Sequence, residues 1–187
     1  MNTGIVICAV ITAFLAVFCC NAFAASGQLP LQTAEKVDLQ KYMGVWHEIS
    51  RLEHGFQKHC IGSGAEYKLA ADNEVEVLNS CTDERDGRRR EAKGRAWSVD
   101  PVNNSKLKVS FFWPFRGDYW IIELGENYRY SVVGSPDRKY LWILGREPEL
   151  DESLYQKIVE RLRTQGFPVD SLVKKPLKGK SENAKLL

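Results

Sequence analysis

The sequence predicts a mainly β protein, an eight-stranded up-and-down antiparallel β-barrel with one α-helix packed outside it near the C-terminus. Three observations lead to this fold class. Short runs of residues alternate between apolar and polar side chains, the breaks between the runs have the length of hairpin turns, and one later segment has the apolar spacing of a helix. A closed barrel is favoured over an open sheet because closure leaves no unpaired strand edge.

Eight runs with strand character follow one another along the chain. In one of them Tyr67 and Leu69 point to one face while Glu66 and Lys68 point to the other, as in a half-buried strand. The pair Asp86-Gly87 is typical of a tight turn between two such runs. The predicted strands are residues 45–49, 65–69, 74–78, 90–99, 106–111, 119–124, 128–133 and 140–144.

The predicted helix covers about residues 151–165. Asp151 can cap its start, Leu154, Ile158 and Leu162 fall on one face, and Gly166 can end it. A last short run, residues 169–173, is a candidate for one more strand. The predicted organisation is a signal peptide over residues 1–24, a linker over 25–36, the barrel domain over 37–175 and a flexible basic tail over 176–187.

The N-terminus has the character of an export signal. Residues 4–20 contain no charged side chain, and Ala22-Phe23-Ala24 provides a small-x-small cleavage site, so we expect cleavage after Ala24 and a periplasmic or secreted protein. No Lys or Arg precedes the apolar segment, which is atypical. Two alternatives remain: a membrane anchor, and attachment to the outer membrane through a lipidated Cys19 or Cys20.

Removal of the leader would leave two cysteines, Cys60 and Cys81, which we expect to form a disulfide in an oxidising compartment. Such a bridge would stabilise the fold by roughly 3 kcal/mol. We expect no metal site, because the sequence has only three histidines and lacks the ligand spacing of a zinc site. The 26 basic against 24 acidic residues give a net charge of +2, which does not suggest a nucleic-acid-binding protein.

Three motifs in order resemble those of the lipocalins, and specifically their bacterial branch, which includes outer-membrane lipoproteins. The first is Gly44-Val45-Trp46, the second is Asp137 before Tyr140, and the third is Arg146 after a strand. The stretch at residues 108–115 is also similar to the bacterial members, and the likeness covers about residues 37–175.

The resemblance implies that Trp46 plugs the closed end of the barrel and that Arg146 lies across its indole. A cation–π contact of this kind contributes about 1–2 kcal/mol when it is partly desolvated. Gly44 would let the backbone pass close by. In this reading Gly44, Trp46, Asp137 and Arg146 are structural residues.

Alternation indicates which side chains face the cavity of such a barrel. Lys106 and Lys108 should point outward, which turns Val109 and Phe111 inward. Polarity does not decide the facing of residues 119–124. Arg116 is placed at the mouth, where its guanidinium suits a carboxylate or phosphate head group. The predicted ligand-binding residues are Tyr67, Leu69, Val75, Val77, Val109, Phe111, Arg116, Tyr119, Val133, Tyr140, Trp142 and Leu144.

The expected function is binding, storage or transport of a small hydrophobic ligand, most simply a fatty acid or lysophospholipid, without a cofactor and without catalysis. The sequence has no Gly-x-Ser-x-Gly motif, and Arg51 stands where a zinc-protease helix beginning at His47 needs its second histidine. Membrane association and a homodimer are left open.

Three alternatives remain: two belong to other classes, and tetrapyrrole binding is a variant of ligand binding. A lipocalin-fold enzyme would need facing ionisable groups inside the barrel, for which Glu48, Tyr67 and Tyr140 are the candidates. A tetrapyrrole binder would use His47 or His54 as an axial ligand. In the third alternative the barrel is filled by its own side chains. Glu48 shares a face with Trp46, so it should point inward and needs a polar partner there.

Overall fold

The computed structural model describes residues 29–71 and 74–174 of the chain. The predicted signal peptide at 1–24, with Cys19 and Cys20, and the predicted tail at 176–187 therefore lie outside the described residues. Within the part that is described, no helix is both long and apolar enough to cross a membrane.

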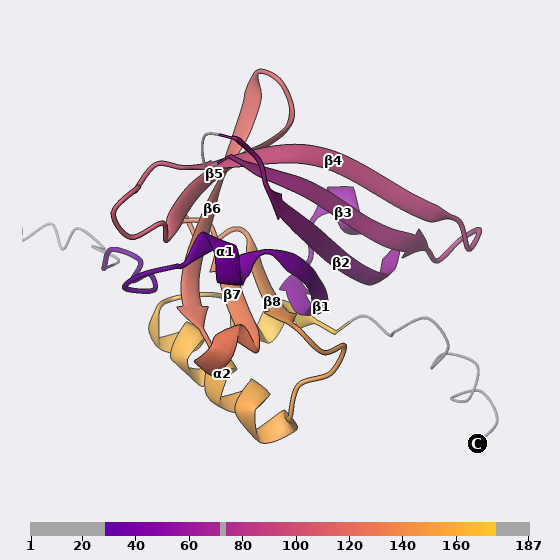
Figure 1. Cartoon of the computed structure of the whole chain (residues 1–187). Coiled ribbons are helices and arrows are strands. Elements are labelled where there is room, and N and C mark those ends of the chain that lie inside the picture. Colours follow the sequence, from indigo (N-terminus) through magenta and orange to yellow (C-terminus); the bar gives the residue numbers. More distant parts are fainter. Residues whose placement is uncertain (1–28, 72–73, 175–187) are drawn as a thin grey trace, which may run out of the picture.

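The fold is a closed antiparallel barrel, as the alternation of the sequence predicted (Figure 1). Its strands neighbour one another in the order β2-β3-β4-β5-β6-β7-β8-β1, and β1 also pairs with β2, which closes the cylinder. A short β9 adds to the far end of β1. The strands are β1 (Gly44–Leu52), β2 (Cys60–Leu69), β3 (Val75–Asp83), β4 (Arg89–Ser98), β5 (Lys106–Phe112), β6 (Phe115–Leu124), β7 (Tyr130–Gly134), β8 (Leu141–Gly145) and β9 (Leu172–Val173).

The predicted strand limits were too short at β1, β2, β3 and β6, and one to two residues early at β7 and β8. Before β7, Asn127 and Tyr128 have φ of +52° and +59°, and they lie in the 3-10 turn η3 (Glu126–Tyr128). Left-handed backbone cannot continue a strand, so β7 begins only at Tyr130. The candidate last strand at 169–173 is mainly the 3-10 turn η4 (Val169–Ser171), followed by β9.

The C-terminal helix α2 (Glu152–Thr164) packs against the outside of the barrel (Figure 1). Asp151 caps its start by accepting a hydrogen bond from the backbone N–H of Leu154 at 2.9 Å. Ile158 and Leu162 are fully buried in a second hydrophobic cluster together with outward-facing residues of β6, β7 and β8. The barrel wall therefore lies between two apolar cores, one inside the cylinder and one beneath α2.

The closed end of the barrel is built around Trp46, which is fully buried. The guanidinium carbon of Arg146 lies 3.8 Å from the centroid of its ring. The same guanidinium donates hydrogen bonds to the carbonyls of Val45 at 3.0 Å and Lys41 at 2.8 Å. Lys41 belongs to the short helix α1 (Leu39–Tyr42), which covers this end.

Gly44 makes the contact between Arg146 and the backbone possible. Its φ is +98°, a conformation that side-chain-bearing residues rarely adopt, and a Cβ there would lie 3.3 Å from a guanidinium nitrogen of Arg146. The two outer motifs of the sequence thus meet in space. Asp137 has a different structural role, since it caps the β7–β8 turn by accepting hydrogen bonds from the Ser135 hydroxyl at 2.5 Å and the Lys139 N–H at 3.2 Å.

Replacement of Arg146 by alanine should lower the free energy of unfolding by roughly 2–4 kcal/mol, because it removes the cation–π contact and several charge-assisted hydrogen bonds together. Chemical denaturation measures this change. Arg129→Ala is the matched control, because Arg129 is an exposed arginine at the same end of the barrel. A similar loss in both variants would contradict a special role for the stack on Trp46.

Candidate functional site

The open end of the barrel lies opposite α1. Four connections lie at the end of the barrel opposite Gly44, as the strand register shows. They are the β3–β4 turn, the β5–β6 hairpin, the β7–β8 turn and the segment between β1 and β2. In Figure 1 the β3–β4 and β5–β6 hairpins project well beyond the rest of the barrel. A ligand that enters the barrel would pass this rim.

The closed half of the interior is crossed by a chain of hydroxyl groups. The Tyr119 hydroxyl lies 2.9 Å from the hydroxyls of both Tyr67 and Tyr42, and the latter lies 3.0 Å from the Ser131 hydroxyl. Burial raises the pKa of Tyr42 to about 12 and also raises the pKa values of Tyr67 and Tyr119. These phenols are therefore neutral, and each has a hydrogen-bond partner.

Little space remains around these tyrosines. The cavity enclosed there has a volume of about 10 Å³, with Leu39, Met43, Val77 and Leu107 among its lining residues. A space of that size holds roughly one water molecule. The closed half of the barrel, called the lower half below, is thus filled by its own side chains.

The half of the barrel next to the open end, called the upper half below, presents small residues on its inner wall. The register pairs Val77 with Gly94 and Asn79 with Ala92, so Gly94 and Ala92 of β4 face inward with Val77. Ala92 is exposed to solvent, whereas Ala96, four residues further along β4, is buried. Water therefore reaches the inner wall from the rim to about Gly94.

The opposite wall of this upper half comes from β5 and β6. Phe111 leans over Gly94, where an added Cβ would lie 2.7 Å from its ring, and Val109 is half-buried in the barrel core. Gly117 of β6 pairs with Val109, and an added Cβ there would meet nothing nearer than Val109 at 4.0 Å. The wall thus leaves room at Gly117.

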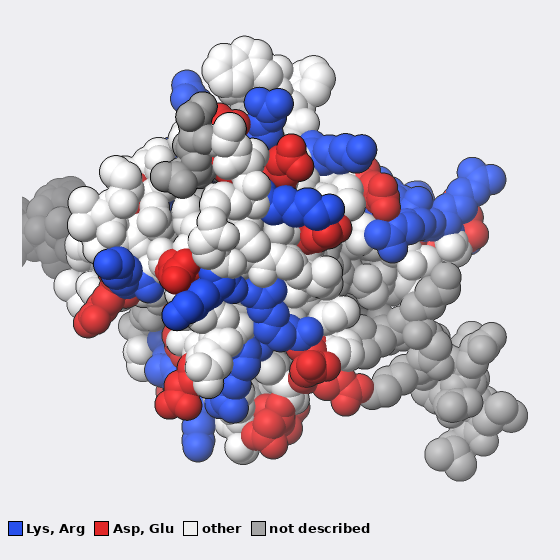
Figure 2. Space-filling view, in the orientation of Figure 1, with Lys and Arg blue, Asp and Glu red and all other residues white. Residues whose placement is uncertain are grey.

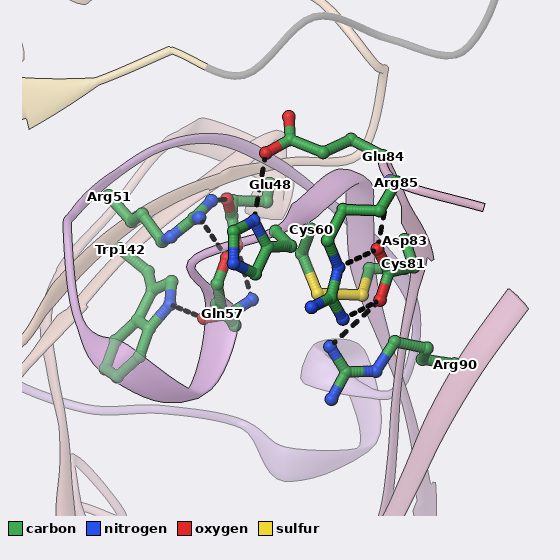
Figure 3. The surroundings of a disulfide bond; sticks show 11 residues. Glu48, Arg51, Gln57, Cys60, Cys81, Asp83, Glu84, Arg85, Arg90 and Trp142 are labelled. Atoms are coloured by element: carbon green, nitrogen blue, oxygen red, sulfur yellow. Dashed lines mark hydrogen bonds and ion pairs between the residues drawn. A yellow bond between two sulfur atoms is a disulfide. The ribbon is translucent and has the colours of Figure 1, made fainter. Parts of the chain in front are cut away.

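A polar network lies on the wall near the rim (Figure 3). Glu48, which is 8% exposed, forms an ion pair with Arg51, which is 0% exposed. Gln57 donates its amide to Glu48 at 3.0 Å and accepts the indole N–H of Trp142 at 3.1 Å, while Arg51 donates to the Gln57 carbonyl at 2.7 Å. The network joins the turn η1 (Gly55–Gln57) to the barrel and orients the Trp142 indole.

A β-bulge explains why this ion pair was missed in the sequence. Residues three apart on a regular strand face opposite sides, so Glu48 and Arg51 should not meet. The pairing of β1 with β8 shifts register between Glu48 and Ser50, and the extra residue turns Arg51 to the side of Glu48. Arg51 is thus the partner that the inward Glu48 required.

Four aromatic rings surround the network at the rim. The His54 ring stacks on Phe56 with centroids 3.8 Å apart and lies 5.2 Å from the Trp142 ring, which is stacked parallel to Tyr140 at 6.0 Å. Both ring nitrogens of His54 are buried, and neither has a hydrogen-bond partner in the described structure. Burial, with a smaller effect from the nearby Arg51 charge, lowers the pKa of His54 to about 4.

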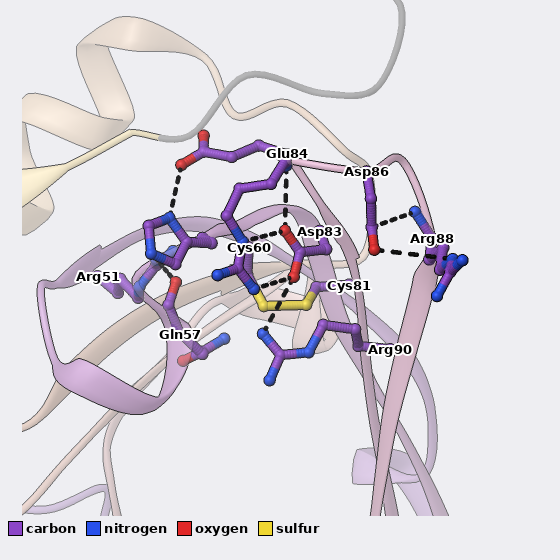
Figure 4. Close-up of polar contacts among 11 residues, drawn as sticks. Arg51, Gln57, Cys60, Cys81, Asp83, Glu84, Asp86, Arg88 and Arg90 are labelled. Atoms are coloured by element: carbon purple, nitrogen blue, oxygen red, sulfur yellow. Dashed lines mark hydrogen bonds and ion pairs between the residues drawn. A yellow bond between two sulfur atoms is a disulfide. The ribbon is translucent and has the colours of Figure 1, made fainter.

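A second polar cluster holds the β2–β3 edge of the rim. The disulfide between Cys60 and Cys81 joins these strands, with Cα atoms 5.4 Å apart. Next to it the carboxylate of the buried Asp83 accepts two hydrogen bonds from the Arg85 guanidinium, at 2.7 and 2.9 Å (Figure 4). The same carboxylate lies 3.6 Å from the guanidinium of Arg90. The Arg85 hydrogen bonds lower the pKa of Asp83. In the described ranges, no three His, Cys, Asp or Glu side chains gather as a metal site would require.

The predicted ligand-binding residues divide between the two halves. Trp142, Tyr140, Val109 and Phe111 lie in the upper half or at its rim, and Arg116 is exposed on β6 near the mouth. Tyr119 belongs to the hydroxyl chain, and the bulge between Ile121 and Glu123 explains why simple alternation did not decide its strand. The remaining predicted residues belong to the packed interior cluster; they are Tyr67, Leu69, Val75, Val77, Val133 and Leu144.

The sequence makes His54 only an alternative tetrapyrrole ligand, and no sequence pattern points to Phe56 or Gln57 of the rim cluster. These residues lie outside the regular strands, where no periodicity applies. His47 lies on the outer face of β1, because its neighbours Trp46 and Glu48 both face inward.

Breaking the buried ion pair from one side should be costly. Arg51→Met leaves the Glu48 carboxylate without its guanidinium and should destabilise the fold by about 3–5 kcal/mol. Addition of Glu48→Gln should recover part of that loss, which a double-mutant cycle of unfolding free energies measures. The exposed pair of Arg89 with Glu91 is the control, and Arg89→Met should cost less than about 1 kcal/mol. Strict additivity at the buried pair would refute the coupling.

Stability should also depend on pH through His54. Because its folded-state pKa is depressed, the unfolded chain binds the proton first as the pH falls, so stability is complete above about pH 6.5 and declines towards about pH 4. His54→Phe keeps an aromatic ring and should weaken the decline, measured as the urea midpoint across this range. His59→Gln, at a half-buried ring that lies 3.4 Å from Glu84, should retain most of it. An unaltered pH profile in His54→Phe would contradict the assignment.

Comparisons with known proteins agree with this geometry. The family model described as a lipocalin-like domain matches residues 37–177. The outer membrane lipoprotein Blc of Vibrio cholerae is 38% identical over 137 residues, which cover 73% of this chain and 80% of that protein. Blc of Citrobacter freundii is 34% identical, with 90% of this chain and 93% of the relative covered.

Among solved structures, insecticyanin from the tobacco hornworm Manduca sexta superposes with a TM-score of 0.65 at 18% identity, covering 81% of this chain and 87% of that one. This likeness supports the fold. Together with the family model and the bacterial relatives, it leads to one conclusion. The chain belongs to the lipocalin family, in its bacterial branch.

Proposed function

We propose that the protein binds a single-chain lipid, a fatty acid or a lysophospholipid, in the upper half of its barrel, and that it stores or transports this lipid. The observation that supports the proposal most directly is the contrast between the two halves. The lower half is packed around the tyrosines, whereas the upper half has small residues on a wall that water reaches.

The upper half suits an acyl chain by its size and its chemistry. Along β4 the distance from the buried Ala96 to the rim at Arg90 is about 20 Å, at the usual rise of a strand. Val109, Phe111 and Trp142 offer apolar contact on the facing walls. Each methylene that leaves water on binding contributes roughly 0.8 kcal/mol.

Arg116 is the candidate for the head group. Its guanidinium is exposed and forms no ion pair with an acidic side chain of the described chain, so its donors remain available to a carboxylate or phosphate. Arg51 is a poorer candidate because Glu48 already neutralises it. The division of roles is therefore an apolar site within the mouth and a cationic group above it.

The cellular setting belongs to the same proposal. The bacterial relatives are named outer membrane lipoproteins, which supports export of this chain to the cell envelope. Its proposed role there is lipid binding without catalysis. Attachment through Cys19 or Cys20 is the anchored form of this proposal, and a soluble exported protein is the other.

Lysophospholipid added to the delipidated protein should change the fluorescence of Trp142. The chain has five tryptophans, so the signal is the difference between wild type and Trp142→Phe. Gly117→Leu should fill the space facing Val109 and weaken binding roughly tenfold or more, since it displaces several methylenes of the ligand.

Val102→Leu is the control for that substitution, because Val102 is exposed at the closed end of the barrel. It should bind the lipid as the wild type does. A Trp142 signal that lysophospholipid and fatty acid both leave unchanged would overturn the proposed function.

A further inference from the structure

The tip of the β5–β6 hairpin exposes three large aromatic side chains. Phe112, Trp113 and Phe115 are 74%, 73% and 71% exposed. In Figures 1 and 2 this hairpin forms a projection at the top of the molecule, beyond the charged body. Soluble surfaces rarely present such a contiguous apolar group unless it meets a partner.

The projection is narrow and internally braced. Phe112 pairs with Phe115 across the turn, their rings stack at 6.3 Å, and the Ser110 hydroxyl donates to the Phe115 carbonyl at 2.7 Å. Such contacts fix the direction of the aromatic side chains. The tip is therefore a convex apolar wedge, and it offers no flat face or groove.

The charges at the base of the wedge point to the kind of partner. Lys108 and Asp118 neutralise each other at 2.6 Å. Arg116 lies 5.9 Å from the Trp113 ring and has no acidic partner among residues 29–71 and 74–174. Tryptophan and phenylalanine beside an arginine whose charge can reach phosphates are typical of segments that anchor at a lipid–water interface.

We propose that this wedge docks into an anionic lipid surface and brings the barrel mouth against it. Phe112 and Trp113 would lie at the depth of the head groups, with Arg116 on the lipid phosphates. Phe111, next along the same strand, faces the inner wall, so apolar contact runs from the wedge into the barrel. This docking goes beyond the binding of a single lipid and does not require one in the barrel.

A second copy of the chain fits the wedge less well. A stable protein interface buries about 800 Å² on each partner over complementary faces. A hairpin tip is far narrower than that, and a symmetric partner would bring a second Arg116 close to the first. Dimer formation through the wedge is therefore the competing outcome in the experiment.

The test uses the exported full chain and vesicles of phosphatidylglycerol with phosphatidylethanolamine, some carrying brominated acyl chains. Bromine should quench Trp113, measured as the difference between wild type and Trp113→Phe. The triple variant Phe112→Ser, Trp113→Ser and Phe115→Ser should lower the vesicle partition coefficient at least roughly tenfold. Val99→Ser with Val102→Ser, at exposed valines of the closed end, is the matched control and should bind as wild type.

Arg116→Gln should reduce the preference for phosphatidylglycerol over phosphatidylcholine vesicles. The triple variant should still bind monomeric lysophospholipid, which separates loss of docking from failure of the proposed function. Absence of Trp113 quenching would overturn the proposal, whether the protein is the soluble exported form or the lipid-anchored form. So would a wild type that sediments as a dimer while the triple variant is monomeric and both partition equally.

Discussion

The contact between Arg146 and Trp46 is the constraint on which the barrel depends. It joins the end of the last barrel strand to the beginning of the first, so it closes the cylinder at one end by side chains as well as by backbone pairing. The same guanidinium reaches the carbonyls of α1, and the Trp46 indole donates to the Tyr42 carbonyl at 2.9 Å. One guanidinium therefore holds helix, strand and indole together, and Gly44 leaves the space that it occupies.

The tyrosine chain above this floor determines how deep the usable interior is. Three phenols in an apolar barrel would be costly if any hydroxyl lacked a partner, and the hydrogen bonds to one another and to Ser131 remove that cost. Their size fills the space that a larger calyx would leave open. The fold thus has a packed lower half and an upper half that water reaches, and the proposed lipid-binding site lies in the latter.

Alternation, the helical spacing of apolar residues and three motifs were enough to predict the barrel, its floor and the helix outside it, because these features follow from a regular period along the chain or from residues of special chemistry. The sequence could not reveal the ion pair of Glu48 with Arg51 or the facing of β6. Both depend on bulges, and a bulge arises from how two strands pair, which neither strand encodes alone. The rim aromatics were missed because they lie in irregular backbone, where orientation is a tertiary property.

The disulfide makes the two sides of the rim mechanically unequal. Cys60 and Cys81 lock β2 to β3 at the mouth, and Asp83 with its arginines braces the adjoining turn. The β5–β6 and β7–β8 sides have no covalent link of this kind in the described chain. We therefore expect thermal motion at the mouth to be larger on the β5–β8 wall than at the β2–β3 edge, with faster exchange of the amide hydrogens on that wall.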